Sequence, residues 1–363
     1  PLRGNEMKVL LIGPSETKTR GGMAQVIRQI RESPILNREY EIHSFPSCME
    51  GRLPLGLIYS CCAFLRFLLC FWKYDLFHIH AAERGSTFRK IFYLRVIKAA
   101  GKSVILHIHG AEYLTFYDGL KGRKKRAADE LFRRADLVLA LSESWKRELE
   151  SRFAMKECKV VYNGVDPGQY QTAGDPVRHR AAFLRMGRLG ERKGVYDLIA
   201  AMELALEKNP GLKLCLAGDG QVEKVRGLVA ERGLEGHITV PGWIQEAEKK
   251  EYLKNAGTIV LPSYHEGLPL SILEGMAAGR AVIGTTVGAI PEVVGKENGI
   301  LVEPGDVRGL AEALLTCSGN EALLGEMSRR NKERAEQVFN IRRMHEKLSE
   351  CYKSTRDREE GTK

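Results

Sequence analysis

Short apolar runs alternate with helical segments along almost the whole chain, and this alternation constrains the fold more than any other feature. Residues 7–13 read MKVLLIG, an apolar run that ends in glycine and is typical of a buried parallel strand. A loop with Gly21 and Gly22 follows, and a helical pattern then runs to Arg31. Strand, glycine-containing turn and helix in this order open a doubly wound α/β domain, because parallel strands need a crossover helix between them.

The alternation occurs twice, with a break between the two series. Further strands are predicted at 40–45, 75–81, 103–110, 136–142 and 159–166, and then at 181–187, 212–218, 237–242, 258–263, 280–286 and 299–304. Helices are predicted at 86–100, 122–134, 143–153 and 194–208, near Gln221 and Leu270, and from 306 onward. The break, PGQYQTAGDPVR, has the Pro, Gly and polar content of a linker.

A chain of 363 residues is too long for a single hydrophobic core. We therefore predict an N-terminal Rossmann-like domain at 1–166, a linker at 167–178, a second Rossmann-like domain at 179–340 and a helical tail at 341–363. Open α/β sheets bind ligands at the carboxyl ends of their strands, so two such domains facing across a cleft would serve two substrates.

The charge balance is basic, with 56 Lys and Arg residues against 46 Asp and Glu residues and a formal net charge of +10. This balance indicates either an anionic partner, such as a phosphate or an acidic lipid, or simply charged helix faces in water. None of the eight cysteines forms a C-x-x-C pair and no Cys/His cluster has zinc spacing. We therefore expect free thiols and a reducing, cytoplasmic setting, with no cleavable signal peptide.

The most apolar segment is 57–72, LIYSCCAFLRFLLCFW. It is only sixteen residues long and contains Arg66, whereas a membrane-spanning helix needs about 20 apolar residues without a central charge. We reject a transmembrane helix and expect a helix buried in the first domain. A helix on a membrane surface, with Arg66 at the lipid headgroups, is the alternative.

A basic loop, GRLGERKG at 187–194, follows one predicted strand and precedes a predicted helix. Arg188 and Lys193 would lie at the carboxyl end of the strand, beside a helix N-terminus, where two cations make an anion site. An ordinary charged surface loop is the alternative interpretation.

A second loop, SYHEGLPLSILE at 263–274, carries Glu266 and Glu274. A carboxylate accepts two hydrogen bonds and so suits the neighbouring hydroxyls of a sugar. Alternatively, Glu274 only stabilises the helix dipole. The backbone N–H groups of the same loop that are available for phosphate oxygens belong to Gly267, Leu268 and Leu270.

Two glutamates separated by seven residues are the signature of the retaining family 4 glycosyltransferases, and the chain resembles this family and its GT-B relatives. The matching segments also include Glu274-Gly-Met-Ala-Ala-Gly279, Gly288-Ala-Ile-Pro-Glu292, Asn163-Gly-Val-Asp166, Gly218-Asp-Gly220 and Pro241-Gly-Trp243. The chain departs from the family at Ala281, where the family usually has Pro. The resemblance is strong over 159–303 and extends to bacterial polysaccharide-assembly members.

This resemblance implies a GT-B fold, with the acceptor on the first domain and a UDP- or GDP-linked sugar donor on the second. It implies that Arg188 and Lys193 neutralise the donor diphosphate, that Glu274 binds the ribose hydroxyls and that Glu266 contacts the donor sugar. The other positions implied to bind the donor are Gly21, Gly22, Gly187, Gly218, Trp243, Ile244, Gly267, Leu268 and Leu270.

The first domain contributes one further catalytic candidate. His109, in the HIHG sequence of 107–110, resembles the first-domain histidine that faces the transferred sugar. A packed core histidine is the alternative for a residue at a strand end. His80 and Arg84 are hypothesised to line the acceptor side.

Breaking a sugar–phosphate bond develops negative charge on the diphosphate, which Arg188, Lys193 and a helix N-terminus would oppose. The sequence has no Asp-x-Asp motif, so we expect no metal and no cofactor. Related retaining enzymes use front-face attack assisted by the leaving phosphate, and we nominate no side-chain nucleophile.

Other functions fit the sequence less well. A sugar-nucleotide epimerase, or a non-catalytic sugar-nucleotide-binding partner, would use the same scaffold, whereas a phosphorylase would need a pyridoxal-phosphate lysine. The basic run 121–126 has no interleaved aromatic residues, so we expect no nucleic-acid partner. Together with 57–72, it favours peripheral contact with an anionic membrane and a glycan or lipid-linked acceptor. The base, the sugar and the oligomeric state stay open.

Overall fold

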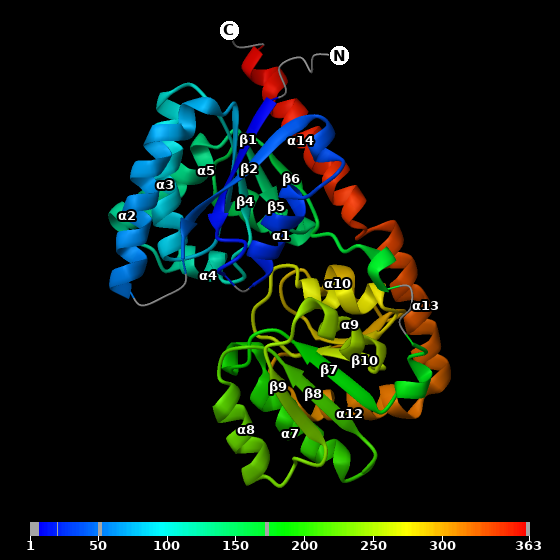
Figure 1. The fold of residues 1–363 in the computed structure, drawn as a ribbon. Helices are drawn as coiled ribbons and strands as arrows, with labels where there is room; N and C mark the ends of the chain where they lie inside the picture. The colour runs from blue at the N-terminus through cyan, green and yellow to red at the C-terminus, as the bar shows by residue number, and fades with distance from the viewer. Residues whose placement is uncertain (1–6, 20, 50–52, 171–173, 361–363) are drawn as a thin grey trace. The chain divides into compact units, whose positions relative to one another are not determined.

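The computed structural model describes residues 7–19, 21–49, 53–170 and 174–360. The chain forms two compact units, one built from 1–163 and 342–363 and the other from 164–341. Each unit holds a six-stranded sheet flanked by helices, and the strand pairs are parallel (Figure 1). The predicted α/β class with two Rossmann-like sheets is therefore confirmed.

The first sheet has the strand order β2-β1-β3-β4-β5-β6. Its strands are β1 (Met7–Pro14), β2 (Tyr40–Cys48), β3 (Leu76–Ala81), β4 (Ser103–Ile108), β5 (Leu137–Ala140) and β6 (Cys158–Val160). Every residue of β3 and β4 is buried, as expected for parallel strands with helices on both faces. The accompanying helices are α1 (Gly22–Arg31), α2 (Leu53–Cys70), α3 (Gly85–Ala99), α4 (Tyr113–Asp118), α5 (Gly122–Arg134) and α6 (Glu143–Arg152).

The last helix, α14 (Ile341–Glu360), belongs to the first unit although it comes at the end of the chain (Figure 1). The ring of Tyr352 packs edge-on against Tyr40 of β2, with 5.3 Å between ring centroids. Lys353 forms an ion pair with Glu39 at 2.9 Å. The segment predicted as a helical tail is therefore part of the first core.

The second sheet has the strand order β12-β11-β10-β7-β8-β9. Its strands are β7 (Ala182–Met186), β8 (Lys213–Ala217), β9 (Ile238–Gly242), β10 (Thr258–Leu261), β11 (Ala281–Thr285) and β12 (Gly299–Val302). Its helices are α7 (Val195–Leu206), α8 (Val222–Glu231), α9 (Glu246–Lys254), α10 (Leu270–Ala277), α11 (Ile290–Val293), α12 (Val307–Gly319) and α13 (Glu321–Gln337). Side chains cap two of these helices, since Asp306 accepts from Gly309 and Asn320 accepts from Leu323.

The two units meet along the chain near Gly164 and Ile341. There the backbone N–H of Val165 donates to Phe339 at 2.8 Å, and that of Ile341 donates to Val165 at 2.7 Å. The two crossing segments are thus hydrogen-bonded to each other inside the second unit. Residues 167–178, predicted as a linker, also belong to the second unit and include 3-10 turns at Pro167–Tyr170 and Val177–His179.

The expectation of a buried helix at 57–72 is wrong for most of that segment. In α2, Ala63 and Phe67 are buried, but Leu57 and Leu69 are 67% and 77% exposed. The two buried residues are four positions apart, so only a narrow stripe of the helix is covered. Because α2 is apolar on every face, its sequence gave no periodicity from which the covered face could be identified.

Phe67 anchors α2 to the first core. Its ring lies 5.8 Å from Phe45, 6.0 Å from Phe77 and 4.8 Å from Tyr93, measured between centroids. By length and composition alone, Leu55–Lys73 is the one helix in the described residues that could cross a membrane. The buried ring of Phe67 packs α2 against the first unit.

Candidate functional site

The loops predicted to hold the donor meet at the reversal point of the second sheet. Strand β7 comes first in this unit, yet it lies between β10 and β8. The strand order therefore reverses between β7 and β10, and open α/β sheets bind ligands at such a point. The basic loop 187–194 follows β7, and the acidic loop 263–274 follows β10.

The basic loop is held by close backbone packing against the loop after β8. The N–H of Gly187 donates to Ala217 at 3.0 Å, and that of Leu189 donates to Asp219 at 2.6 Å. Gly218 has a φ of +155°, and a Cβ there would collide with the carbonyl group of Gly187. The predicted glycines thus allow two loops to lie against each other.

The two predicted cations of the basic loop have different surroundings. Arg188 is exposed, and its side chain makes no hydrogen bond or ion pair within the described residues. Lys193 is mostly buried, and its Nζ lies 2.5 Å from Oε1 of Glu266. Burial lowers the pKa of Lys193, although the charge of Glu266 opposes this shift.

Glu266 links the two loops. Its Oε1 atom accepts hydrogen bonds from Lys193 and, at 2.7 Å, from the hydroxyl of Ser263. Its Oε2 atom makes no hydrogen bond within the described part of the chain and is not fully buried. The carboxylate is thus fixed through one oxygen and offers the other to a ligand.

Glu274, on the first turns of α10, has a partner that the sequence did not indicate. Its Oε1 lies 2.7 Å from Nζ of Lys249, on α9, and Lys249 also lies 3.1 Å from Glu246. Burial disfavours the charged Lys249, but the two carboxylates outweigh it and raise its pKa. Sequence reasoning missed Lys249 because α9 was not predicted.

Arg185 is a second residue that was missed. It is fully buried in β7, and its guanidinium donates to the carbonyls of Gly187 and Arg188. Burial lowers its pKa to about 10, while Glu266 and Asp219 favour its charge. An arginine inside the apolar strand AFLRM was the available signal, since such a residue needs internal partners.

The remaining predicted donor residues lie around the same edge. Gly267 and Leu268 are buried in the turn before α10, and Leu270 is its first residue. Trp243 is 42% exposed and, with Ile244, follows β9. These two residues lie beyond β8, two strands away from the reversal point.

In the first unit, the predicted residues also flank a reversal point, here between β1 and β3. Gly21 and Gly22 form the start of α1, and Gly21 has a φ of +142° that favours glycine. Arg84 precedes α3, is exposed and has an unusual positive φ of +60°. His80, hypothesised to line the acceptor side, is fully buried.

Four histidines share one side of the first sheet where β3 and β4 end. His78 and His80 are two residues apart on β3, and His80 pairs with His107 in the strand register. The ring of His78 stacks on His80 at 4.3 Å, and that of His107 lies 4.1 Å from His109. Burial lowers the pKa of each ring, to about 3 for His78 and His109, so all four are neutral.

His78, His80 and His107 each have a ring nitrogen within 4.8 Å of those of the other two, which is close enough for one metal ion to bind all three. The ring orientations do not fit. A metal lies in the plane of each imidazole that binds it, but the planes of His78 and His80 are only 25° apart in a stacked pair. The nitrogen lone pairs of the two rings are therefore nearly parallel and do not point toward a common metal ion. We assign no metal to this cluster.

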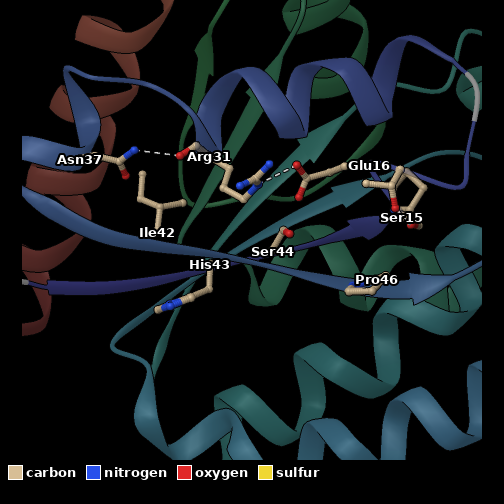
Figure 2. Close-up of a pocket in the computed structure, with 10 residues that line it drawn as sticks. Ser15, Glu16, Arg31, Asn37, Ile42, His43, Ser44 and Pro46 are labelled. Carbon is tan, nitrogen blue, oxygen red and sulfur yellow. Dashed lines mark hydrogen bonds and ion pairs between the residues drawn. The ribbon is translucent and has the colours of Figure 1, made fainter.

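Two cavities are found in the described part of the chain. One, of about 470 Å³, lies between the end of β1, the following loop and β2, and an ion pair between Glu16 and Arg31 at 2.7 Å borders it (Figure 2). A second, of about 600 Å³, lies between α7 and α8. Neither cavity is lined by a predicted site residue.

Comparison with known proteins identifies the class. Residues 7–169 match the family model described as Glycosyltransferase Family 4, and residues 180–320 match the model described as Glycosyl transferases group 1. Together these regions span most of the chain. The chain belongs to the family 4 type of glycosyltransferases with the GT-B fold.

Two bacterial relatives illustrate the similarity. WcaL of Escherichia coli, named for colanic acid biosynthesis, is 29% identical over 293 residues, which is 77% of this chain and 70% of WcaL. The amylovoran biosynthesis glycosyltransferase AmsK of Erwinia amylovora is 27% identical over 286 residues, 76% of this chain and 69% of AmsK.

Solved structures agree on the fold. Sucrose-phosphate synthase from Thermosynechococcus elongatus has a TM-score of 0.78 at 19% identity, over 96% of this chain and 98% of that protein. HepE of Anabaena, in complex with UDP and glucose, has a TM-score of 0.76 at 20% identity, over 96% of this chain and 100% of HepE.

Proposed function

We propose that this glycosyltransferase moves a sugar, with retention of configuration, from a UDP- or GDP-linked donor to a glycan or lipid-linked acceptor in polysaccharide or cell-envelope biosynthesis. The donor would bind at the edge of the second sheet. Relatives named for colanic acid and amylovoran biosynthesis, and the UDP complexes of HepE, support this proposal.

One observation carries the proposal. Two lysine–glutamate pairs, Lys193–Glu266 and Lys249–Glu274, lie on or beside the loops that follow the two strands of the reversal point. Each pair sets a cation beside a carboxylate. A nucleotide sugar needs both, because its diphosphate is anionic and its ribose and sugar carry neighbouring hydroxyls.

The roles of these residues follow from the charge that develops during transfer. As the sugar–phosphate bond breaks, negative charge grows on the diphosphate, and Lys193, Arg188 and the N–H groups before α10 would stabilise it. Glu266 would orient the sugar through Oε2, since its Oε1 is held by Lys193 and Ser263. Glu274, already bonded to Lys249, would accept from the ribose.

The first test is donor binding. Calorimetry with a panel of UDP- and GDP-sugars, without added metal, should find one donor that binds the wild type and binds Lys193→Ala at least about tenfold more weakly, because a hydrogen bond to a charged group is lost. Lys208→Ala, an exposed lysine beyond the other end of α7, should bind like the wild type. A folded protein that binds no nucleotide sugar would refute the proposed donor site.

Retention and metal independence can be measured together. We expect proton NMR of the first product formed to show the anomeric configuration of the donor. Addition of EDTA should leave the rate unchanged. An inverted product, or activity that is lost with EDTA and restored by a divalent cation, would refute these parts of the proposal.

We also propose that the first unit contacts an anionic membrane, where a lipid-linked acceptor would be found. Leu57 and Leu69 of α2 are exposed, and so is Trp72 in the 3-10 turn Phe71–Lys73 that follows. The cationic side chains of Arg66 and Lys73 on the same segment are exposed as well. Apolar side chains with interspersed cations fit a membrane interface.

Liposome flotation tests this contact. The wild type should bind vesicles rich in anionic lipid at low salt and should bind neutral vesicles weakly. Leu57→Gln with Leu69→Gln should reduce binding without changing stability, because both side chains are exposed. Leu204→Gln, which alters an exposed leucine of the second unit, is the control. No binding by the wild type would end this part of the proposal.

A further inference from the structure

The four histidines form two hydrogen-bonded pairs across β3 and β4. In one pair, Nδ1 of His80 lies 2.9 Å from Nε2 of His109. In the other, Nε2 of His78 lies 3.2 Å from Nδ1 of His107, and Nδ1 of His78 lies 2.9 Å from the hydroxyl of Tyr352 on α14. Each ring is neutral and carries one proton, so each pair has two possible proton arrangements.

The buried environment distinguishes the two arrangements. Nε2 of His80 is buried and has no hydrogen-bond partner among the described residues. If His109 donated from Nε2, the proton of His80 would lie on its own Nε2, as a buried N–H without an acceptor. Such orphaned donors are rare in folded proteins and tolerated less well than a bare lone pair. His80 therefore donates from Nδ1, and His109 accepts at Nε2.

The same rule does not decide the second pair. Nε2 of His107 is also buried without a partner in the described chain. In one arrangement the N–H at Nε2 of His107 lacks an acceptor, and in the other the buried hydroxyl of Tyr352 lacks one among the described residues, so the proton positions of this pair stay open.

His109 is held rigidly in this arrangement. Its backbone N–H donates to the carbonyl of Ala81 at 2.8 Å. A Cβ at the following Gly110 would collide with Glu83, so the backbone after His109 lies tightly against the loop after β3. His109 itself is partly exposed. Its Nδ1 atom makes no hydrogen bond within the described residues and is not fully buried.

We propose that His80 is a positioning residue that fixes His109 in the Nδ1–H form, so that His109 presents a hydrogen-bond donor to an oxygen of the substrate. This inference rests on the proposed function and on the resemblance of His109 to the first-domain histidine that faces the transferred sugar. The ligand atom is a hydroxyl or phosphate oxygen. His109 then binds and orients that oxygen, and it does not act as a general base through Nδ1, because Nδ1 carries the proton.

The experiment reads the tautomer directly and needs no substrate. In full-length protein labelled with ¹⁵N-histidine, two-bond ¹H–¹⁵N correlation shows which nitrogen of each ring is protonated, and single substitutions assign the signals. We expect the Nδ1–H form for His109 in the wild type. His80→Leu should convert much of His109 to the Nε2–H form or to a mixture, whereas His80→Asn, which keeps a side-chain N–H near the Nδ1 position, should preserve Nδ1–H.

Tyr352→Phe is the matched control, because it alters only the other pair. It should leave the signals of His80 and His109 in the Nδ1–H form. If donor turnover is measured, we expect His80→Leu to lower kcat about tenfold, as for one lost oriented hydrogen bond, and His80→Asn to recover most of it.

Two results would overturn the inference. One is an Nε2–H form of His109 in the wild type. The other is an unchanged Nδ1–H form in folded His80→Leu; if that variant fails to fold, the wild-type spectrum alone decides. Correct tautomers in a protein that binds no nucleotide sugar would instead count against the proposed function and leave the tautomer assignment standing.

Discussion

Acidification should destabilise the first unit because its stacked histidines stay neutral in the fold. The pKa of His78 is about 3 in the structure, since the ring is fully buried, against an ordinary value of 6.5. Below pH 6.5 the unfolded chain takes up a proton that the folded chain does not. The contribution of His78 to stability is therefore complete above about pH 6.5 and is lost progressively as the pH falls toward 3.

The magnitude follows from the size of the pH change. Near pH 5.5, one unit below the pKa of histidine in the unfolded chain, His78 should lower the free energy of unfolding of the first unit by about 1.4 kcal/mol relative to neutral pH. The pKa values of His80, His107 and His109 are lowered as well, so these rings should add to the destabilisation in the same direction.

Amide hydrogen exchange at β3 and β4 measures this free energy for the first unit alone. The loss between about pH 7.5 and pH 5.5 should be smaller by about 1.4 kcal/mol in His78→Asn, which removes one titrating ring. Equal pH dependence in His78→Asn and the wild type would refute the reasoning.

Three further predictions concern packing and the donor site. Phe67→Ala should lower the free energy of unfolding by about 3–5 kcal/mol, whereas Leu69→Ala, whose side chain is 77% exposed, should change it by less than about 0.5 kcal/mol, as denaturant titration will show. Gly218→Ala should destabilise the second unit by more than about 1 kcal/mol and weaken donor binding, because the new Cβ would collide with the loop after β7; thermal unfolding and calorimetry measure the two effects. Glu274→Gln should weaken binding of a nucleoside diphosphate about tenfold but leave binding of its 2′,3′-dideoxy analogue unchanged in calorimetry. Glu251→Gln, at an exposed carboxylate of α9 that does not contact Lys249, should bind both like the wild type.

Much of the fold could be predicted from the sequence because parallel strands that are buried on both faces consist of continuous apolar runs. The helix predicted at 122–134 has the same bounds in the structure, and β4 was predicted only two residues too long. Glu266, Arg188 and Lys193 could be placed at one edge of the second sheet because their loops follow such strands. The spacing of Glu266 and Glu274 along one loop is a local property of the sequence, so it can be recognised without knowledge of tertiary contacts.

What the sequence did not show depends on contacts between distant segments. Helix α9 is polar and buries only Leu253, so it has no apolar stripe, and the ion pair from Lys249 to Glu274 was therefore missed. The return of α14 to the first unit rests on contacts such as Tyr352 with His78, more than 270 positions apart. The pairing of His80 with His109 likewise needs the register of β3 and β4, which no local pattern specifies.

The central claim is that the donor binds the second unit at the loops after β7 and β10. Hydrogen–deuterium exchange with and without a UDP- or GDP-sugar locates the binding directly. We predict that exchange will slow at 187–194 and 263–274 in the wild type, and that this protection will be lost in Lys193→Ala. Protection confined to other segments, or protection that persists unchanged in Lys193→Ala, would contradict the account.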